Sequence, residues 1–250
     1  MISNKTTIFG LRPVIEAMQH GKEIDKVLIQ FDLQGAMAGE LRRLVKEHNV
    51  PCQFVPLEKL NRITMKNHQG VIAEISPITY YKIENLLPTL FESRQIPLLV
   101  MLDGITDVRN MGAIVRTAEC AGAHAVIIPQ SGTASLNADS MKTSAGALNI
   151  IPVCREVNLS EALNYIRNSG VQAIACSEKA NDNYTDADLT LPILLIIGSE
   201  GSGISPELLR NCDKQVKIPL FGKIVSLNVS VSAGIILFEA MRQRSMNNEK

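Results

Sequence analysis

Two stretches decide the fold: residues 194–205, LLIIGSEGSGIS, and residues 218–235, IPLFGKIVSLNVSVSAGI. The first is an apolar run that ends in a glycine-rich turn containing Glu200, and the second has Ser226 and Asn228 just before a helical pattern. Glycine lets a backbone pass close to a ligand. A Ser or Asn cap leaves the amide groups of a helix N-terminus directed outward. The two loops therefore predict a pocket for a small ligand with polar edges. We expect this ligand to be a cofactor.

The composition is that of an ordinary globular protein. The chain has 250 residues, of which 46% are apolar and 20% charged, enough for one large or two small domains. Lys plus Arg equal Asp plus Glu at 25 each, so the whole-chain charge predicts no polyanionic partner. Any nucleic-acid site must therefore be a local patch.

The cysteines and histidines predict no metal site and no disulfide framework. Five cysteines are scattered without a CxxC pair, and four histidines lack any HxxxH or HExxH spacing. No signal peptide is evident, and apolar runs such as residues 96–102 are too short to cross a membrane. We expect a cytoplasmic protein with buried, reduced thiols and no membrane segment.

The first part of the chain, residues 1–76, reads as a small α/β unit. A helical pattern follows Gly10, and an amphipathic helix is expected at residues 38–48. Strands are expected at residues 26–30, 52–55 and 71–75. Residues 77–93 contain Leu87-Pro88 and few core-type periodicities, which predicts a linker, partly helical near its end, between two folding units.

The second unit, residues 94–250, reads as a parallel sheet covered on both faces. Its strands lack polar alternation and are spaced by helices. We expect strands at residues 96–102, 125–129, 149–153, 171–176 and 193–197, and helices at 111–121, 139–144 and 159–168. Asn110 is the expected N-cap of the first helix. Ligands on such sheets bind at the carboxyl ends of strands, where loops 177–181, 198–202 and 220–228 emerge.

Arg116 is the unusual residue of helix 111–121, whose other positions are nearly all small or apolar. It either pairs with Glu119 three residues later or faces a cleft that holds an anion. The helix alone favours neither.

Three motifs together resemble a known enzyme family. The stretch LDGITDVRNMGAIVRTAECAG at residues 102–122 and the two opening stretches are similar to the three signature motifs of the SpoU (TrmH) family of S-adenosylmethionine-dependent RNA 2′-O-methyltransferases. The N-terminal TTIFGLRPVIEAM at residues 6–18 resembles the small substrate-binding domain, similar to ribosomal protein L30e, of many members. Val108 stands where many relatives have Pro, and Leu220 where Met is common.

The resemblance implies an L30e-like RNA-binding domain at 1–76, a linker at 77–93 and a SPOUT-type α/β methyltransferase domain at 94–250 with a C-terminal trefoil knot. It implies a homodimer with RNA crossing the interface, and S-adenosylmethionine as cofactor. Cofactor-binding positions are Gly198, Ile218 and Leu227, and catalytic positions are Asn110, Arg116, Glu200, Ser226 and Asn228.

The implied chemistry requires a nucleophilic ribose 2′-hydroxyl held in line with an activated methyl group. A guanidinium hardly deprotonates, so we interpret Arg116 as binding the adjacent phosphate and stabilising alkoxide charge. A phosphate oxygen, Ser226 or water then accepts the proton.

Rival readings fit less well. The glycines at 198–203 follow GxxGxG, not GxGxxG, and no Lys follows Gly203, which argues against dinucleotide-binding and P-loop folds. The resemblance to the subgroup with an N-terminal substrate-binding domain implies a guanosine of 23S ribosomal RNA as the target. The alternatives are a transfer RNA ribose 2′-O-methyltransferase and a non-catalytic RNA-binding protein on the same fold.

Overall fold

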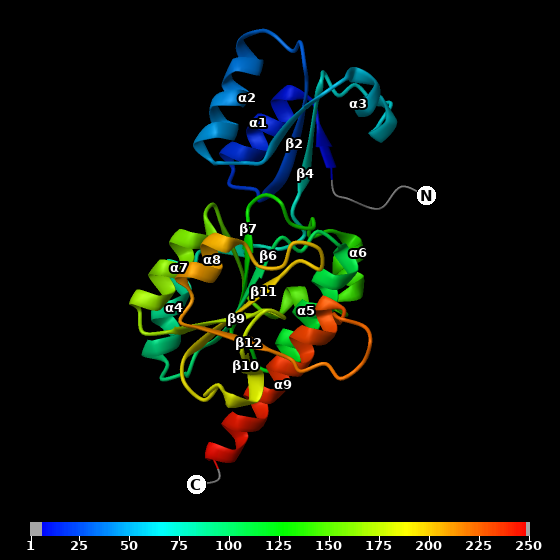
Figure 1. Cartoon of the computed structure of the whole chain (residues 1–250). Coiled ribbons are helices and arrows are strands. Elements are labelled where there is room, and N and C mark those ends of the chain that lie inside the picture. Colours follow the sequence, from blue (N-terminus) through cyan, green and yellow to red (C-terminus); the bar gives the residue numbers. More distant parts are fainter. Residues whose placement is uncertain (1–6, 249–250) are drawn as a thin grey trace. The chain divides into compact units, whose positions relative to one another are not determined.

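The structure, a computed structural model, describes residues 7–248. The first six residues of the expected N-terminal domain and the last two of the expected methyltransferase domain lie outside the described residues. Along the chain, contacts separate two compact units between Thr79 and Tyr80. We refer to them as unit one and unit two and describe each by itself (Figure 1).

Unit one is a four-stranded sheet with helices on both faces. Its strands are in the order β1-β4-β2-β3. In chain order the elements are β1 (Thr7–Phe9), α1 (Leu11–Gln19), β2 (Ile24–Gln30), α2 (Ala36–Glu47), β3 (Cys52–Val55), α3 (Leu57–Ile63) and β4 (Val71–Ile75). On one face, Val27 and Ile29 of β2 pack among the apolar residues of α1 and α2. On the other, Leu28 packs with Leu60 of the short helix α3. The expected small α/β unit is therefore present.

Unit two is built on an eight-stranded sheet in the order β10-β12-β9-β11-β6-β7-β8-β5, and all its strand pairs are parallel. The strands are β5 (Tyr80–Tyr81), β6 (Leu98–Asp103), β7 (Ala125–Pro129), β8 (Val153–Glu156), β9 (Gln172–Cys176), β10 (Asp182–Asn183), β11 (Ile193–Gly198) and β12 (Lys214–Lys217). The helices are α4 (Ile83–Glu92), α5 (Val108–Cys120), α6 (Ala138–Thr143), α7 (Leu159–Asn168), α8 (Pro206–Asn211) and α9 (Val229–Asn248), with short 3-10 turns η1 (Ala147–Asn149) and η2 (Tyr184–Asp186).

Helices cover both faces of this sheet, as expected for fully apolar parallel strands. Buried side chains of α4, α7 and α8 pack against one face in a single cluster with residues such as Met101 and Ile196. Helices α5 and α9 pack together on the other side (Figure 1). Buried neighbours in the strands, such as Val100 and Leu195, lie between the two helical layers.

Three local expectations were wrong. Residues 77–93 do not form a linker throughout, because Tyr80–Tyr81 pair with β8 and helix α4 buries Ile83 and Leu87 in the core. The N-cap of α5 is Asp107 rather than Asn110. The strand expected at residues 149–153 begins only at Val153, after the turn η1. Strand pairing explains the first of these differences, whereas Asp107 caps α5 through local contacts with Arg109 and Asn110.

The strand order reverses beside β6. From β6 the chain adds β7 and then β8 on one side, whereas β9 and β11 lie on the other. Open α/β sheets bind ligands outside the carboxyl ends of the strands near such a reversal. Asn110 follows β6, and Glu200 follows β11.

Candidate active site at the carboxyl edge of the sheet

The turn after β11 is held in place by its own backbone. Ser199 and Gly203 form an antiparallel bridge, so the chain returns directly over Gly198. A Cβ atom on Gly198 would lie 2.2 Å from the Gly203 carbonyl carbon and 2.3 Å from the Ile204 nitrogen. Only glycine fits there, since the clash is with backbone. The sequence interpretation assigned this freedom to a ligand, and the structure shows that the chain itself uses it.

Asp103, the last residue of β6, connects this turn to the neighbouring strand. Its Oδ2 accepts the Ser205 backbone N–H at 2.7 Å. A half-buried carboxylate that accepts a backbone amide makes a strong, directional contact. The loops after β6 and β11 are therefore fixed relative to each other, although the sequence analysis had given Asp103 no role.

Glu200 is the centre of a hydrogen-bond network that joins three distant segments. Its Oε1 accepts the Asn228 Nδ2 at 2.7 Å, the Asn110 Nδ2 at 3.2 Å and the Val229 backbone N–H at 3.3 Å. Asn228 Nδ2 also donates to Asn110 Oδ1 at 3.0 Å. Three of the five expected catalytic residues thus contact one another across 118 residues of chain.

Two helix caps orient the asparagines of this network. Asp107 Oδ1 accepts the backbone N–H groups of Arg109 at 2.9 Å and Asn110 at 2.8 Å, which fixes the first turn of α5. Asn228 Oδ1 accepts the Ser230 N–H at 3.0 Å and so caps α9. The expected capping role of Asn228 is confirmed, whereas the cap of α5 comes from Asp107.

Arg116 is outside this network and lies on the surface two turns along α5. Among the described residues, no hydrogen bond or ion pair of its guanidinium is present, so the expected alternative of a pair with Glu119 does not form. One turn earlier, a Cβ on Gly112 would lie 2.7 Å from the Thr143 Cβ and 3.0 Å from the Ser140 carbonyl oxygen. Helix α6 therefore packs closely on α5 at Gly112, one turn before the exposed Arg116.

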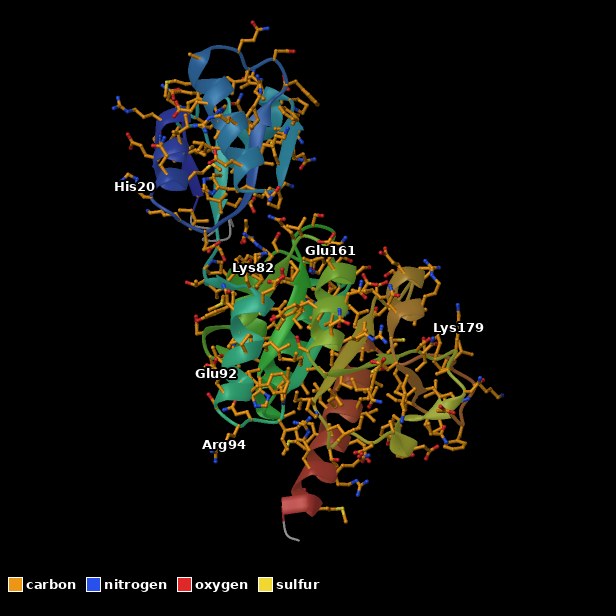
Figure 2. All side chains as sticks on the ribbon, turned by 90° about the vertical axis from the view of Figure 1, so that its left-hand side faces the viewer. His20, Lys82, Glu92, Arg94, Glu161 and Lys179 are labelled. Carbon is orange, nitrogen blue, oxygen red and sulfur yellow. The ribbon has the colours of Figure 1, made fainter. Side chains whose placement is uncertain are left out.

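A pocket lies next to the network, and three loops line it. They are the loop after β9 at 177–179, the turn at 198–204 and the segment at 216–227, with the first turns of α9. The three expected cofactor positions, Gly198, Ile218 and Leu227, all line this pocket, as do Glu200 and Ser226. Lys179, on the first loop, projects at the outer surface of unit two (Figure 2).

The lining suits a nucleoside that carries a charged tail. Apolar side chains such as Ile197 and Ile236 offer faces for a flat base, and Ser177, Glu178 and Ser232 offer polar groups for a ribose and an amino acid. The residues present therefore fit S-adenosylmethionine.

The thiols near the sheet are not nucleophiles. Burial, with a smaller contribution from Glu156, raises the pKa of Cys154 to about 12. Burial likewise raises the pKa of the pocket residue Cys176 to about 12. Both remain neutral at pH 7. Within residues 7–248 no group of three or more His, Cys, Asp or Glu side chains is arranged to hold a metal ion. No helix in the same range has the length and apolar character to cross a membrane.

Family models match nearly the whole chain. The model described as the SpoU rRNA Methylase family matches residues 97–238. The model described as RNA 2′-O ribose methyltransferase substrate binding matches residues 7–81. The two matches correspond to the two units of the structure.

Individual relatives agree with these models. The chain is 41% identical to the 23S rRNA (guanosine-2′-O-)-methyltransferase RlmB of Photorhabdus laumondii, over 95% of this chain and 98% of that protein. It is 32% identical to Bacillus subtilis YacO, assigned by name to the TrmH family of tRNA/rRNA methyltransferases, over 95% and 96% of the two chains. The crystal structure of the SpoU methyltransferase AviRb from Streptomyces viridochromogenes with AdoMet superposes with a TM-score of 0.62 at 27% identity, covering 97% of this chain and 92% of that one.

Proposed function

This chain belongs to the SpoU rRNA methylase family and is an S-adenosylmethionine-dependent RNA 2′-O-methyltransferase, and from that premise we propose that its target is a guanosine ribose of 23S ribosomal RNA. The proposal is supported by the 41% identity to RlmB over 95% of the chain. It is also supported by unit one, because the A. aeolicus TrmH/SpoU tRNA modifying enzyme matches only 66% of this chain.

The observation that carries the mechanism is the Glu200 network beside the pocket. S-adenosylmethionine supplies a methyl group that its sulfonium already activates, so the protein must position the nucleophile. We assign this work to Asn110, Glu200 and Asn228, whose mutual hydrogen bonds hold the two asparagine side chains in fixed directions. Gly198, Ile218 and Leu227 are the proposed cofactor contacts, since each lines the pocket.

Arg116 is the proposed phosphate ligand. Its guanidinium is exposed, and within the described part of the chain it has no carboxylate partner, so it can bind the phosphate beside the target ribose. From there it stabilises the alkoxide that develops on the 2′-oxygen. Ser226, a phosphate oxygen or water accepts the proton, and Ser226 is supported by its position on the pocket wall.

Replacing Arg116 by Lys tests this role. Lysine keeps the charge but loses the planar fork, so we expect reduced but measurable methyl transfer. Complete loss of transfer with unchanged RNA affinity would contradict charge stabilisation as the role of Arg116.

The proposed assembly is a homodimer. An apolar stripe along α9, made of Val231, Phe238 and Met241, is exposed in the single chain, and Phe221, in the segment before α9, is almost fully exposed at 96%. Exposed apolar stripes of this kind mark protein interfaces. Light scattering should give twice the 27.3 kDa chain mass, and Phe238→Glu should give the monomer. A wild-type monomer would contradict the assembly.

The proposed knot concerns the segment between β12 and α9. Strand β12 lies beyond β9 in the sheet, whereas α9 packs on α5. The connecting residues 218–228 must therefore cross the carboxyl edge, where the turn at 198–204 also lines the pocket. We propose that the C-terminal part of the chain threads through a loop of unit two and so forms a trefoil knot. A crystal structure whose backbone trace contains no knot would contradict threading.

One experiment tests reaction and substrate together. Purified protein is incubated with methyl-labelled S-adenosylmethionine and separate 23S, 16S and transfer RNA from cells that lack its gene, and the RNA is digested to nucleosides. We expect label in 2′-O-methylguanosine from 23S RNA. The proposed location of the enzyme is the cytoplasm. Label in transfer RNA, the alternative that the name of YacO keeps open, would overturn the substrate. No label in any pool, with no cofactor binding, would favour a non-catalytic RNA-binding protein.

A further inference from the structure

Two lysines of unit one meet at a single amide oxygen. Gln53 Oε1 accepts the Lys26 Nζ at 2.8 Å and the Lys59 Nζ at 3.5 Å. The three residues come from β2, β3 and α3, so the fold brings them together from separate elements. The two ammonium groups that share this oxygen carry the same charge and therefore repel each other.

Lys26 lies on a part of the sheet beside α3, and Lys59 reaches Gln53 from α3. Helix α3 has only seven residues, and it covers Leu28 and Val55 but not the start of β2 and β3. Gln53 and Lys59 are exposed, and Lys26 is half-buried. Solvent and ligands can therefore reach the pair.

The charges around the two lysines are of both signs. Arg62 follows Lys59 by three residues on α3 and so extends the positive side of that helix. The acidic residues nearby are Glu58, on α3, and Glu74, which pairs with Lys26 in the adjacent strand. Within residues 7–248, neither lysine has a carboxylate within 4.0 Å, so the repulsion between the two ammonium groups is not offset by a direct ion pair.

We propose that Lys26 and Lys59 form a clamp for a phosphate group of the RNA backbone, with Gln53 between them. A phosphodiester oxygen can accept a hydrogen bond from each ammonium group and offset the repulsion between them. The Gln53 amide, fixed by its contacts to both lysines, offers its NH₂ group to the same phosphate or the neighbouring ribose.

RNA is the ligand that the protein already requires. This inference rests on the proposed function, because a methyltransferase with a pocket in unit two gains affinity when unit one holds the same RNA chain. The clamp has no base-reading surface of its own beyond one amide. It therefore contributes affinity and register, not sequence recognition.

The test measures the affinity of the full-length protein for a 23S RNA transcript over a series of KCl concentrations. The double variant Lys26→Gln/Lys59→Gln removes the clamp. The matched control Lys22→Gln/Lys46→Gln removes the same charge from exposed lysines near the other face of unit one. The charge-preserving Lys26→Arg/Lys59→Arg variant tests rescue, and thermal melts confirm folding.

We expect the double variant to bind about ten-fold more weakly at 0.1 M salt, with the slope of log K against log salt reduced by about 0.7 to 0.9, the change for one neutralised phosphate. The control should stay within about two-fold of wild type, and the arginine variant should regain the slope. If the double variant melts early, Lys59→Gln alone, on the exposed helix α3, carries the test, with weaker binding and a smaller change of slope than in the double variant.

Other outcomes overturn the clamp. Unchanged affinity and slope in the clamp variants, while the wild type methylates RNA, would reject the clamp and leave the proposed function standing. Equal losses in clamp and control variants would show non-specific attraction only. Weaker binding of poly-glutamate with RNA binding unchanged would assign the patch to an acidic protein partner. A wild type that neither binds nor methylates any RNA would reject the proposed function itself.

Discussion

The Asn228 side-chain amide donates to the Glu200 carboxylate at 2.7 Å, although the two residues lie 28 positions apart in the chain. Asn228 also caps α9 through its other side-chain atom, Oδ1. One side chain therefore couples the start of the last helix to the turn after β11. A shift of Glu200 must move both the helix start and the asparagine pair beside the pocket.

Replacement of Glu200 by Gln tests this coupling. The amide keeps the size of the side chain and one acceptor oxygen, but that oxygen is no longer part of an anion and so holds the Asn110, Asn228 and Val229 donors more weakly. We expect kcat for methyl transfer to fall about 100-fold, the size of effect that a misplacement of about 1 Å produces, while the fold is kept. A single-turnover assay measures the rate of methyl transfer, and a thermal melt measures whether the fold is kept. Unchanged kcat would show that the network does not position reacting groups.

Gly198 and Gly201 are a matched pair in the same turn. A Cβ on Gly198 would clash with the backbone of Gly203 and Ile204, whereas a Cβ on Gly201 would meet nothing within 4 Å. We expect Gly198→Ala to destabilise the protein by about 3 kcal/mol and to abolish cofactor binding, because the turn must open. Gly201→Ala should change stability by less than about 0.5 kcal/mol. Denaturant unfolding measures the stability of each variant, and calorimetry measures its binding of S-adenosylmethionine. Similar losses of stability and binding in the two variants would refute the backbone clash at Gly198 as the cause.

Much of the site could be predicted from the sequence because its residues lie in contiguous motifs. The apolar run before Gly198 and the polar residues before Val229 each report a strand end or a helix start, and both signals are local. A parallel sheet then brings such ends to one edge. The hydrogen bonds among Asn110, Glu200 and Asn228 depend on strand order, which periodicity does not specify.

Other features were missed because they depend on tertiary contacts. Asp107 and Asn110 are both residue types that cap helices well. The helix α5 begins at Val108, so Asp107 is the cap and Asn110 lies inside the first turn. Helix α4 contains Pro88 and resembled a linker, yet it buries Ile83, Leu87 and Leu90 in the core of unit two. Gly112 looked like one small residue among many, whereas the passage of α6 across it excludes any side chain.

Arg244 anchors α9 to the amino edge of the sheet. Its guanidinium donates to the carbonyl oxygens of Leu189 at 3.0 Å, Ile96 at 2.8 Å, Pro97 at 3.0 Å and Leu191 at 2.7 Å. Lysine lacks the fork that reaches all four, so Arg244→Lys should lower the free energy of unfolding by about 2 kcal/mol. Arg94→Lys, on an arginine that projects into solvent (Figure 2), is the control and should have almost no effect. Equal stability of the two variants would contradict the anchor.

His124 makes the stability of unit two dependent on pH. Burial, with a smaller effect from the nearby Arg244, lowers the pKa of His124 below its usual 6.5, and its Nδ1 receives the Leu98 backbone N–H at 3.0 Å. Above pH 6.5 the imidazole is neutral in both folded and unfolded chains. Below that pH the unfolded chain takes up the proton first, so stability falls as the pH drops toward the folded pKa. We therefore expect a lower free energy of unfolding at pH 5.5 than at pH 7.5.

His124→Gln should make this decrease smaller, because glutamine does not titrate and its amide oxygen can still receive the Leu98 N–H. His20→Gln, on an exposed histidine of unit one (Figure 2), is the control and should keep the wild-type difference between the two pH values. Guanidinium unfolding of the three proteins at both pH values measures the effect. If the His124 variant lost as much stability as wild type between pH 7.5 and 5.5, the pH dependence would have to come from other groups, and the neutral imidazole would have no share in holding the start of β6.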